Sequence, residues 1–527
     1  MVRLPLLAPL LAVAHAFAQA PTTPRTVPEA TAYGATSRAA DVGAFCRALV
    51  NLPHGDRVAL QVAGTTADGH DQLLAHVTVP AAGKDERLRV LVIGNIHGGE
   101  VEGKEAVQEL LREFALGEHE DLLAQFDLWF LPIYNVDGNE KLGANRTEQN
   151  GPPLCGERTN GKGLDLNRDF VKVDAPETRT LMRLFREIDP HLFFDLHTTN
   201  GSHHGYHLTY APSVSPNVDP DVARLSRTLL DRATATMRDD HHFATFDYGN
   251  FETHDWDGGG APESAKGQRG WFTFDHRARY GTNYFALRNR VSILSEAYSH
   301  ADFRTRIAAT RAFVLCVLHA AIVEKAALVT AFAAADRRLE APEAPVGFGF
   351  DPVFAPAETM DVLVGEIEKI PGENGAGPRF ARKGDGRPET MPVIRAFVAR
   401  QHRPLPFAWA VLAPSDDVID RLRQHGVAFE RLDAPRAVVA SRFAVEKKRK
   451  PKPPFQGRQE LVLTGAWREA ATEELPAGTL LVPARQRLAR VAATLLEPES
   501  EDSLSTWTFF DATTTDTFPV LRVDAPR

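Results

Sequence analysis

A histidine and a glutamate three residues apart, His97 and Glu100, flank Gly98-Gly99 directly after an apolar run that ends at Ile96. The run predicts a buried strand, and the two glycines predict a tight turn after it. On such a turn an imidazole and a carboxylate can point at one centre, and these two ligand types are common in catalytic zinc sites. The pair alone is equally consistent with a capping glutamate beside a core histidine, since the chain contains nineteen histidines.

A third metal ligand is expected at the end of a distant strand, and the segment HLFFDLH ends at His197. Three protein ligands would leave zinc with an open position for water, which a hydrolytic site requires. A structural histidine at the strand end is the alternative, and His203, His204 and His207 in the following loop compete for the role. We favour His197, because a strand end aims a ligand more rigidly than a loop.

The segment GLDLNRDF provides polar groups of a different kind. Asn167 and Arg168 can bind a carboxylate through an amide and a guanidinium fork, which would let a site select a free C-terminus. Asp165, two residues earlier, could orient a metal-bound histidine from behind. Taken alone, the segment also fits an Asp/Asn turn followed by a surface arginine.

Strands that alternate with amphipathic helices position these residues, which indicates the α/β class. We expect a closing helix from about 304 to 335, after which Gly/Pro-rich stretches mark a boundary. In the following region, residues 406–432 read as strand, helix and strand, with Ser415 as helix cap and Gly426 as stop. The predicted strands are 58–64, 73–80, 87–95, 126–133, 191–197 and 291–298, and the other predicted helices are 104–115, 175–189 and 219–237.

The sequence suggests four consecutive parts. Residues 1–20 have one arginine, an apolar run and Ala-Gln-Ala before Pro21, the layout of a signal peptide, which predicts a secreted or periplasmic protein. Residues 21–84 form lead-in elements, 85–338 the part that carries the candidate site, and 339–527 a C-terminal accessory region. The basic run 446–454 is expected to be a solvated loop.

Composition excludes several classes of protein. A net charge of −9 argues against a nucleic-acid binder, which would need a strongly basic face. No later segment has about 18 consecutive apolar residues, so we expect no membrane span. Three cysteines are too few for a disulfide framework. Cys46 and Cys316 lie in apolar helical patterns, while a disulfide through Cys155 stays open.

In their order along the chain, these motifs resemble the zinc metallocarboxypeptidases of the carboxypeptidase A superfamily. The resemblance covers about residues 85–320 and implies a carboxypeptidase-like α/β/α sandwich with a mixed central sheet, to which a smaller C-terminal α/β domain would be added. Val136 departs from the family, which often has proline in this turn. The motifs are His97-x-x-Glu100, PIYNVDG (132–138), GERTNGKGLDLNR (156–168), DLHTTNG with His197, and ILSEAY with Glu296.

The resemblance also implies a role for each residue. His97, Glu100 and His197 would bind one zinc ion, and Glu296 would be the general base acting on its water. Asn167 and Arg168 would hold the terminal carboxylate of the substrate. For the arginine that polarises the scissile carbonyl we choose Arg158, ten residues before Arg168, with Arg146 in reserve; for the substrate-binding tyrosine we rank Tyr284 before Tyr280.

The leading hypothesis is therefore an exported zinc carboxypeptidase that hydrolyses C-terminal peptide bonds. One alternative is a zinc deacylase or amidase of the same fold acting on N-acyl amino acids, which also carry a free carboxylate. A catalytically inactive binding module is another, and it would predict a missing ligand or base. The sequence does not indicate the preferred terminal residue or the oligomeric state.

Overall fold

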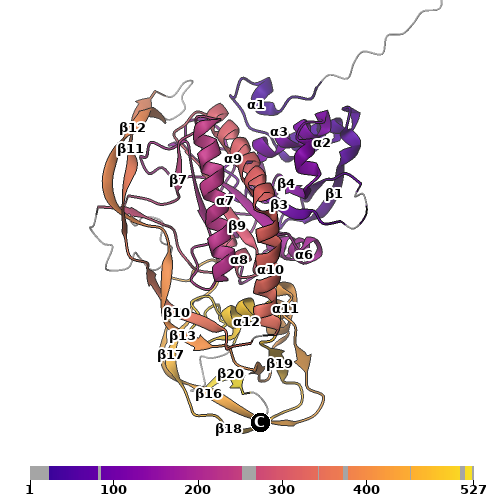
Figure 1. Ribbon diagram of the computed structural model, residues 1–527, viewed down its shortest axis with the longest axis vertical. Helices are drawn as coiled ribbons and strands as arrows, with labels where there is room; N and C mark the ends of the chain where they lie inside the picture. Colours follow the sequence, from indigo (N-terminus) through magenta and orange to yellow (C-terminus); the bar gives the residue numbers. More distant parts are fainter. Residues whose placement is uncertain are drawn as a thin grey trace, which may run out of the picture.

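The computed structural model describes residues 23–80, 83, 85–251, 269–341, 343–371, 378–451, 453–510 and 517–524. Two parts make up this structure: an α/β unit and a strand-rich C-terminal region. Most of the C-terminal region forms the lower part of the molecule in Figure 1, whereas its hairpin of β11 (Glu358–Ile370) and β12 (Arg379–Ile394) extends upward beside the α/β unit. The predicted signal peptide, residues 1–20, lies outside the described residues.

The six predicted strands of the α/β unit, together with β6 and β7, which were not predicted, form one eight-stranded mixed sheet in the order β1-β2-β4-β3-β5-β9-β6-β7. Its centre is parallel, and β5 and β9 are buried at every position, as expected for parallel strands covered on both faces. The strands are β1 (Val58–Thr65), β2 (Asp71–Val77), β3 (Leu88–Gly94), β4 (Phe126–Leu131), β5 (Leu192–Thr198), β6 (Leu208–Pro212), β7 (Thr245–Asp247) and β9 (Val291–Ala297).

Long helices cover the first face of this sheet: α3 (Glu102–Leu116), α7 (Pro220–Asp239), α9 (Phe303–Val323) and α10 (Lys325–Glu340). Phe114 of α3 and Phe313 of α9 share one buried cluster with Val92 and Phe194 of the sheet. These helices confirm the predicted α/β class. The predicted closing helix is divided in two at Glu324, which caps both α9 and α10.

Among the described residues, α9 is the one helix long and apolar enough to cross a membrane, and 72% of its most apolar stretch is buried inside the protein. Its partners are α3, α7 and β9. We therefore interpret α9 as a core helix.

The second face of the sheet is covered by α6 (Pro176–Ile188), α8 (Gly281–Ala286) and the C-terminal region. Ile93 and Phe193 on this face belong to the same buried cluster as Phe185 of α6 and as Trp409 and Phe518 of the C-terminal region. Helices thus lie on both faces, and the C-terminal region shares a hydrophobic core with the α/β unit.

The lead-in strands β1 and β2 are part of the main sheet, because β2 pairs with β4. The boundary that the sequence suggests at residue 84 therefore falls inside one structural unit. Shorter elements around the sheet are α1 (Val27–Ala30), α2 (Ala39–Ala48), α4 (Glu120–Leu123), α5 (Val136–Glu140), β8 (Trp271–Phe272) and the 3₁₀ turns η1 (Leu49–Asn51), η2 (Gly55–Arg57) and η3 (Leu166–Arg168).

The C-terminal region contains the predicted strand-helix-strand unit as β14, α11 and β15, and Ser415 caps α11 by accepting the Val418 N–H at 3.3 Å. The region as a whole is richer in strands than the expected α/β domain. Its elements are β10 (Gly347–Phe354), β11 (Glu358–Ile370), β12 (Arg379–Ile394), β13 (Phe397–Pro404), β14 (Ala408–Val411), α11 (Asp416–His425), β15 (Glu430–Arg431), β16 (Arg436–Arg449), β17 (Val462–Trp467), β18 (Ala471–Leu475), β19 (Leu480–Pro483), α12 (Ala489–Leu496) and β20 (Thr517–Val523).

Two smaller expectations can be compared with the structure. Residues 446–449 are the exposed end of β16, so this part of the basic run is a strand end and not a loop. Cys46, Cys155 and Cys316 are all buried and free, so the structure contains no disulfide through Cys155.

Candidate active site

The turn between β3 and α3 carries the first two candidate ligands, His97 and Glu100. The side-chain amide of Asn95 donates to the backbone carbonyls of His97 at 3.0 Å, Gly98 at 3.2 Å and Glu100 at 2.9 Å, which holds the turn closed. A Cβ on Gly98 would lie 2.4 Å from the Glu157 carbonyl oxygen, so only glycine fits this close approach.

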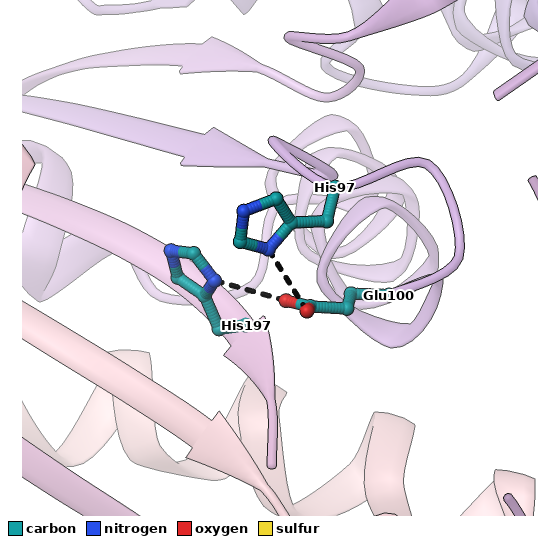
Figure 2. Close-up of side chains that lie close together, drawn as sticks. All are labelled: His97, Glu100 and His197. Carbon is teal, nitrogen blue, oxygen red and sulfur yellow. Dashed lines mark hydrogen bonds and ion pairs between the residues drawn. The ribbon is translucent and has the colours of Figure 1, made fainter. Parts of the chain in front are cut away.

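His197 reaches the same point from the end of β5, the strand next to β3 in the sheet. Its Nδ1 lies 2.9 Å from Oε2 of Glu100, and Nδ1 of His97 lies 2.8 Å from Oε1 of the same carboxylate. Figure 2 shows both imidazoles turned toward Glu100. One ligand atom from each of the three residues lies within 4.8 Å of the other two, and all three residues are buried.

The far nitrogen of each imidazole faces an aspartate. His97 Nε2 lies 3.0 Å from Asp165 Oδ1, which is the orienting contact expected from the sequence. His197 Nε2 lies 2.9 Å from Asp195 Oδ2, a contact that sequence reasoning missed. Residues two apart on a strand point to the same side, so the spacing of Asp195 and His197 on β5 could have revealed it.

Two of the carboxylates around the histidines, Glu100 and Asp165, have lowered pKa values, which favours their charged form. Burial opposes ionisation of Glu100, but the charges and hydrogen bonds of His97 and His197 outweigh it and hold the pKa of its carboxyl well below the usual range. For Asp165, burial is likewise outweighed by Arg158, Arg168 and His97, which lower its pKa. The site therefore concentrates negative charge beside two imidazoles.

This donor set fits zinc. Two imidazole nitrogens and one carboxylate, close together at the edge of a rigid sheet, form a ligand combination typical of catalytic zinc sites. Each imidazole also has a carboxylate behind it, the usual arrangement for a metal-bound histidine.

Glu296 lies beside His197, because the parallel register of β5 and β9 pairs these two residues. Both line one cavity of about 250 Å³, together with His97 and Glu100. Larger grooves exist, including one of about 760 Å³ on the C-terminal sheet, but its lining contains none of these residues. The combination of side chains, and not the volume, identifies the candidate site.

The expected carboxylate-binding residues line the same cavity. The Asn167 side-chain oxygen accepts the Gly281 N–H at 2.9 Å, and the Arg168 guanidinium lies 4.0 Å from the ring centre of Tyr280. Arg158 is half exposed at the cavity and donates from Nε to Asp165 at 2.9 Å. The 3₁₀ turn η3, which carries Asn167 and Arg168, and the loop that carries Arg158 therefore converge on the ligand set.

The structure does not bring Tyr284 to the cavity. Tyr284 is 1% exposed, and its hydroxyl lies 2.6 Å from Nδ1 of His425 in the C-terminal region. Tyr280 and Tyr248 line the cavity instead. Of the two tyrosines considered from the sequence, Tyr280 therefore faces the cavity and Tyr284 faces the C-terminal region.

The competing histidines and the reserve arginine do not line the cavity, although the arginine contacts one of the candidate ligands. Nδ1 of His204 accepts the Tyr206 N–H at 3.2 Å, and Nε2 of His207 faces Arg382 at 2.7 Å. Arg146 contacts Glu100 at 3.1 Å. Neither Arg146 nor His203, His204 and His207 is among the residues that line the cavity.

Comparison with known proteins agrees with this geometry. Residues 44–294 match the profile of the zinc carboxypeptidase family. This segment belongs to that family. The matched segment begins within α2 and contains β1 and β2 of the predicted lead-in part. It contains His97, Glu100 and His197 and ends two residues before Glu296.

Curated relatives of the zinc carboxypeptidase segment match over shorter stretches. Carboxypeptidase 2 of Trichophyton tonsurans is 28% identical over 155 residues, which cover 27% of this chain and 26% of the relative. Carboxypeptidase D of Mus musculus is 36% identical over 118 residues, covering 19% of this chain and 9% of the relative. The match thus spans about a quarter or less of the length of these relatives.

Solved carboxypeptidase structures are also similar to the chain. The crystal structure of a metallo-carboxypeptidase from Burkholderia cenocepacia has 16% sequence identity and a TM-score of 0.41, and the match covers 55% of this chain and 70% of that one. This TM-score is too low to carry an argument, so the family assignment rests on the sequence match and the fold on the structure described above.

Proposed function

We propose that the protein is an exported zinc carboxypeptidase that removes the C-terminal residue of peptides and uses one zinc ion. One observation carries the proposal: a His-Glu-His ligand set, a buried glutamate and an Asn-Arg pair all line a single cavity. Ligands, base and carboxylate recognition are the three parts that such a reaction requires.

His97, Glu100 and His197 would hold the zinc ion, with Asp165 and Asp195 orienting the two imidazoles. Zinc in such a site supplies a Lewis acid that polarises a carbonyl and lowers the pKa of a bound water. The aspartates would keep both imidazoles in the tautomer that offers Nδ1 to the metal.

Glu296 is the proposed general base. It lies beside His197 in the sheet register and is 6% exposed, so its carboxylate works in a site from which bulk water is largely excluded. It would take a proton from the attacking water and return it to the leaving amine. Arg158, within 3.6 Å of Glu100, would stabilise the charge that develops on the scissile carbonyl oxygen.

Asn167 and Arg168 would bind the terminal carboxylate of the substrate, because an amide and a guanidinium together match its two oxygens. We propose Tyr280 as the substrate-binding tyrosine, since it lines the cavity beneath the Arg168 guanidinium. We call Asn167, Arg168 and Tyr280 together the clamp. If the clamp holds the terminal carboxylate, only the last peptide bond of the substrate reaches the ligand set, and the enzyme is an exopeptidase.

The side chain of the terminal residue would meet an apolar surface. Tyr248, Phe274 and Leu294 line the cavity and belong to one buried cluster. Among the described lining residues the only carboxylates are Glu100 and Glu296, and both have other proposed roles. We therefore expect apolar terminal residues to be preferred over lysine and arginine.

A zinc deacylase acting on N-acyl amino acids is the second candidate, since such substrates present the same free carboxylate to Asn167 and Arg168. Export is part of the proposal on the basis of residues 1–20 alone.

A peptide library analysed by mass spectrometry tests the function. We expect loss of single C-terminal residues, complete inhibition by a chelator and recovery with zinc. Glu296→Gln should lower kcat by about 10²- to 10⁴-fold with zinc content unchanged, because it removes the base and keeps the ligands. Release of acyl groups from N-acyl amino acids, with every peptide intact, would favour the deacylase. If Glu296→Gln kept full activity, the base would be wrongly assigned.

A further inference from the structure

Residues 275–281, which follow β8 and end at the first residue of α8, contribute Tyr280 to the lining of the candidate site; we name this stretch the wall segment. It carries Tyr280, which lies under the Arg168 guanidinium, and Gly281, whose N–H donates to Asn167. The two proposed carboxylate-binding residues are therefore in direct contact with the wall segment. A shift of this segment would move the clamp without touching the zinc ligands.

The wall segment is held in place from the C-terminal region by Asp502. The Asp502 carboxylate accepts the backbone N–H of Arg279 at 2.7 Å and its Nε–H at 2.9 Å, and lies 2.9 Å from Nη2. Glu460 lies 2.8 Å from the same guanidinium. Arg279 is 1% exposed, and its guanidinium lies 4.5 Å from the ring centre of Trp507. This anchor is buried and made of several charge-assisted contacts.

The backbone geometry couples this anchor to Tyr280. Tyr280 has an extended conformation, with φ −89° and ψ 136°. In extended backbone, successive side chains point to opposite sides. Because Arg279 is fixed toward Asp502 in the C-terminal region, Tyr280 is turned toward the cavity and Arg168.

A second anchor holds the other side of the clamp. The Gln456 side-chain oxygen accepts the backbone N–H of Asp165 at 2.8 Å, two residues before Asn167. Trp507 also contacts this side, since the Lys172 ammonium lies 4.8 Å from its ring centre and donates to the Arg168 carbonyl at 2.7 Å. Both halves of the clamp are thus attached to the C-terminal region.

We propose that Asp502 and Gln456 of the C-terminal region are positioning residues that align Tyr280, Arg168 and Asn167 for the terminal carboxylate of the substrate. The inference rests on the proposed function and goes beyond it, because it makes the C-terminal region part of substrate recognition. Neither residue lines the cavity, so both act through the residues that do.

The test compares KM, kcat and zinc affinity of the full-length protein and its variants. Asp502→Asn should lower kcat/KM by about ten- to a hundredfold, mainly through KM, because a small displacement of binding groups weakens recognition by that order. Gln456→Ala, which removes one neutral hydrogen bond, should raise KM by about fivefold. Zinc affinity, measured by competition with a chelator, should stay unchanged in Asp502→Asn, because Asp502 contacts the wall segment and none of the zinc ligands or the aspartates that orient them.

Glu497→Gln is the matched control. Glu497 is also a buried carboxylate of the C-terminal region. Its side chain lies 3.3 Å from Arg522 and accepts the Trp409 indole N–H at 2.8 Å, so its contacts are with the C-terminal region and not with the wall segment. We expect this variant to lower the melting temperature while KM stays at the wild-type value. A purely structural role for Asp502 would produce the same pattern in Asp502→Asn and would overturn the inference.

A binding measurement separates this inference from the proposed function. Calorimetry with an N-acyl amino acid reports recognition of the carboxylate whether or not catalysis occurs. A wild-type protein that binds this probe but hydrolyses nothing contradicts the proposed function alone. Equal Kd values for the wild type, Asp502→Asn and Gln456→Ala contradict the positioning role alone. If Asp502→Asn does not fold, the Gln456→Ala result decides.

Discussion

His425, at the end of α11, should make the attachment of the C-terminal region sensitive to acid. Its Nδ1 lies 2.6 Å from the Tyr284 hydroxyl and its Nε2 lies 2.9 Å from the Val171 carbonyl oxygen, so the neutral ring is paired on both sides. Burial is the main reason that its pKa falls from 6.5 to about 3, and the charges of Arg288, Arg421 and Arg186 add to the shift.

The direction of the pH effect follows from proton binding. Below pH 6.5 the unfolded chain binds a proton at His425 that the folded protein does not, so acid favours unfolding. The contribution of His425 is complete above pH 6.5 and is lost progressively as the pH falls toward 3. At about pH 5 the loss is about 2 kcal/mol, since each pH unit below 6.5 contributes about 1.4 kcal/mol.

The prediction is tested with His425→Gln. The glutamine amide can accept a hydrogen bond from the Tyr284 hydroxyl and donate one to the Val171 carbonyl, but it does not titrate. Urea unfolding would be measured at about pH 7.5 and pH 5 for both proteins. We expect the wild type to lose about 2 kcal/mol more than the variant between these conditions. Parallel pH dependence of the two proteins would refute the argument, because it would mean that His425 titrates alike in the folded and unfolded states.

Two further predictions concern the candidate site. Asp195→Asn should weaken zinc binding by about ten- to a hundredfold in a chelator competition, because it removes the charge behind His197; unchanged affinity would mean that Asp195 does not orient the ligand. Arg168→Lys should raise KM with little change in zinc content, since an ammonium cannot reproduce the guanidinium fork. Tyr284→Phe is its control, because the Tyr284 hydroxyl faces His425 and not the cavity; a rise in KM there equal to that of Arg168→Lys would contradict the clamp.

Six of the eight strands of the α/β unit were predictable because each contains a run or an alternation of apolar residues, and α3, α6 and α7 were predictable because they are amphipathic. The short strands β6 and β7 were not predicted. The long hairpin of β11 and β12 was not. The β12 sequence RFARKGDGRPETMPVI contains two glycines and two prolines, residues that locally indicate turns. Pairing with β11 over most of its length stabilises it as a strand, and such pairing is not visible in the local sequence.

The sequence predicted the positions of some residues of the candidate site better than those of others. His97 and Glu100 follow β3, and His197 lies at the end of β5, so strand prediction placed all three at strand ends. That β3 and β5 are neighbours in the sheet, which brings the three residues together, is seen only in the structure. The substrate-binding tyrosine was harder to choose from the sequence. Tyr280 caps the short helix α8 and Tyr284 lies inside it, so both residues come from the same stretch of chain. Only the docking of α11, through His425, shows that Tyr284 faces the C-terminal region.

The C-terminal region lies where it covers an apolar face of the central sheet. One face of the sheet is covered by α3, α7, α9 and α10, but the short helices α6 and α8 cannot cover the other face alone. Ile93 and Phe193 on that face are fully buried in a cluster that Trp409 and Val491 complete. Without these C-terminal residues, part of a large apolar surface would be exposed to water, which is unfavourable by about 25 cal/mol per Å².

Ion pairs across the same interface, such as Arg458 with Asp174 at 2.7 Å and Arg487 with Asp189 at 2.9 Å, add orientation to this apolar contact. Partly exposed pairs of this kind contribute little free energy, so the apolar cluster holds the two parts together and the ion pairs set their register. Asp174 lies six residues after Arg168, in the segment that carries the carboxylate clamp. A change in how the C-terminal region packs on the sheet would therefore also move the segment of the clamp, as our proposal of a positioning role for this region requires.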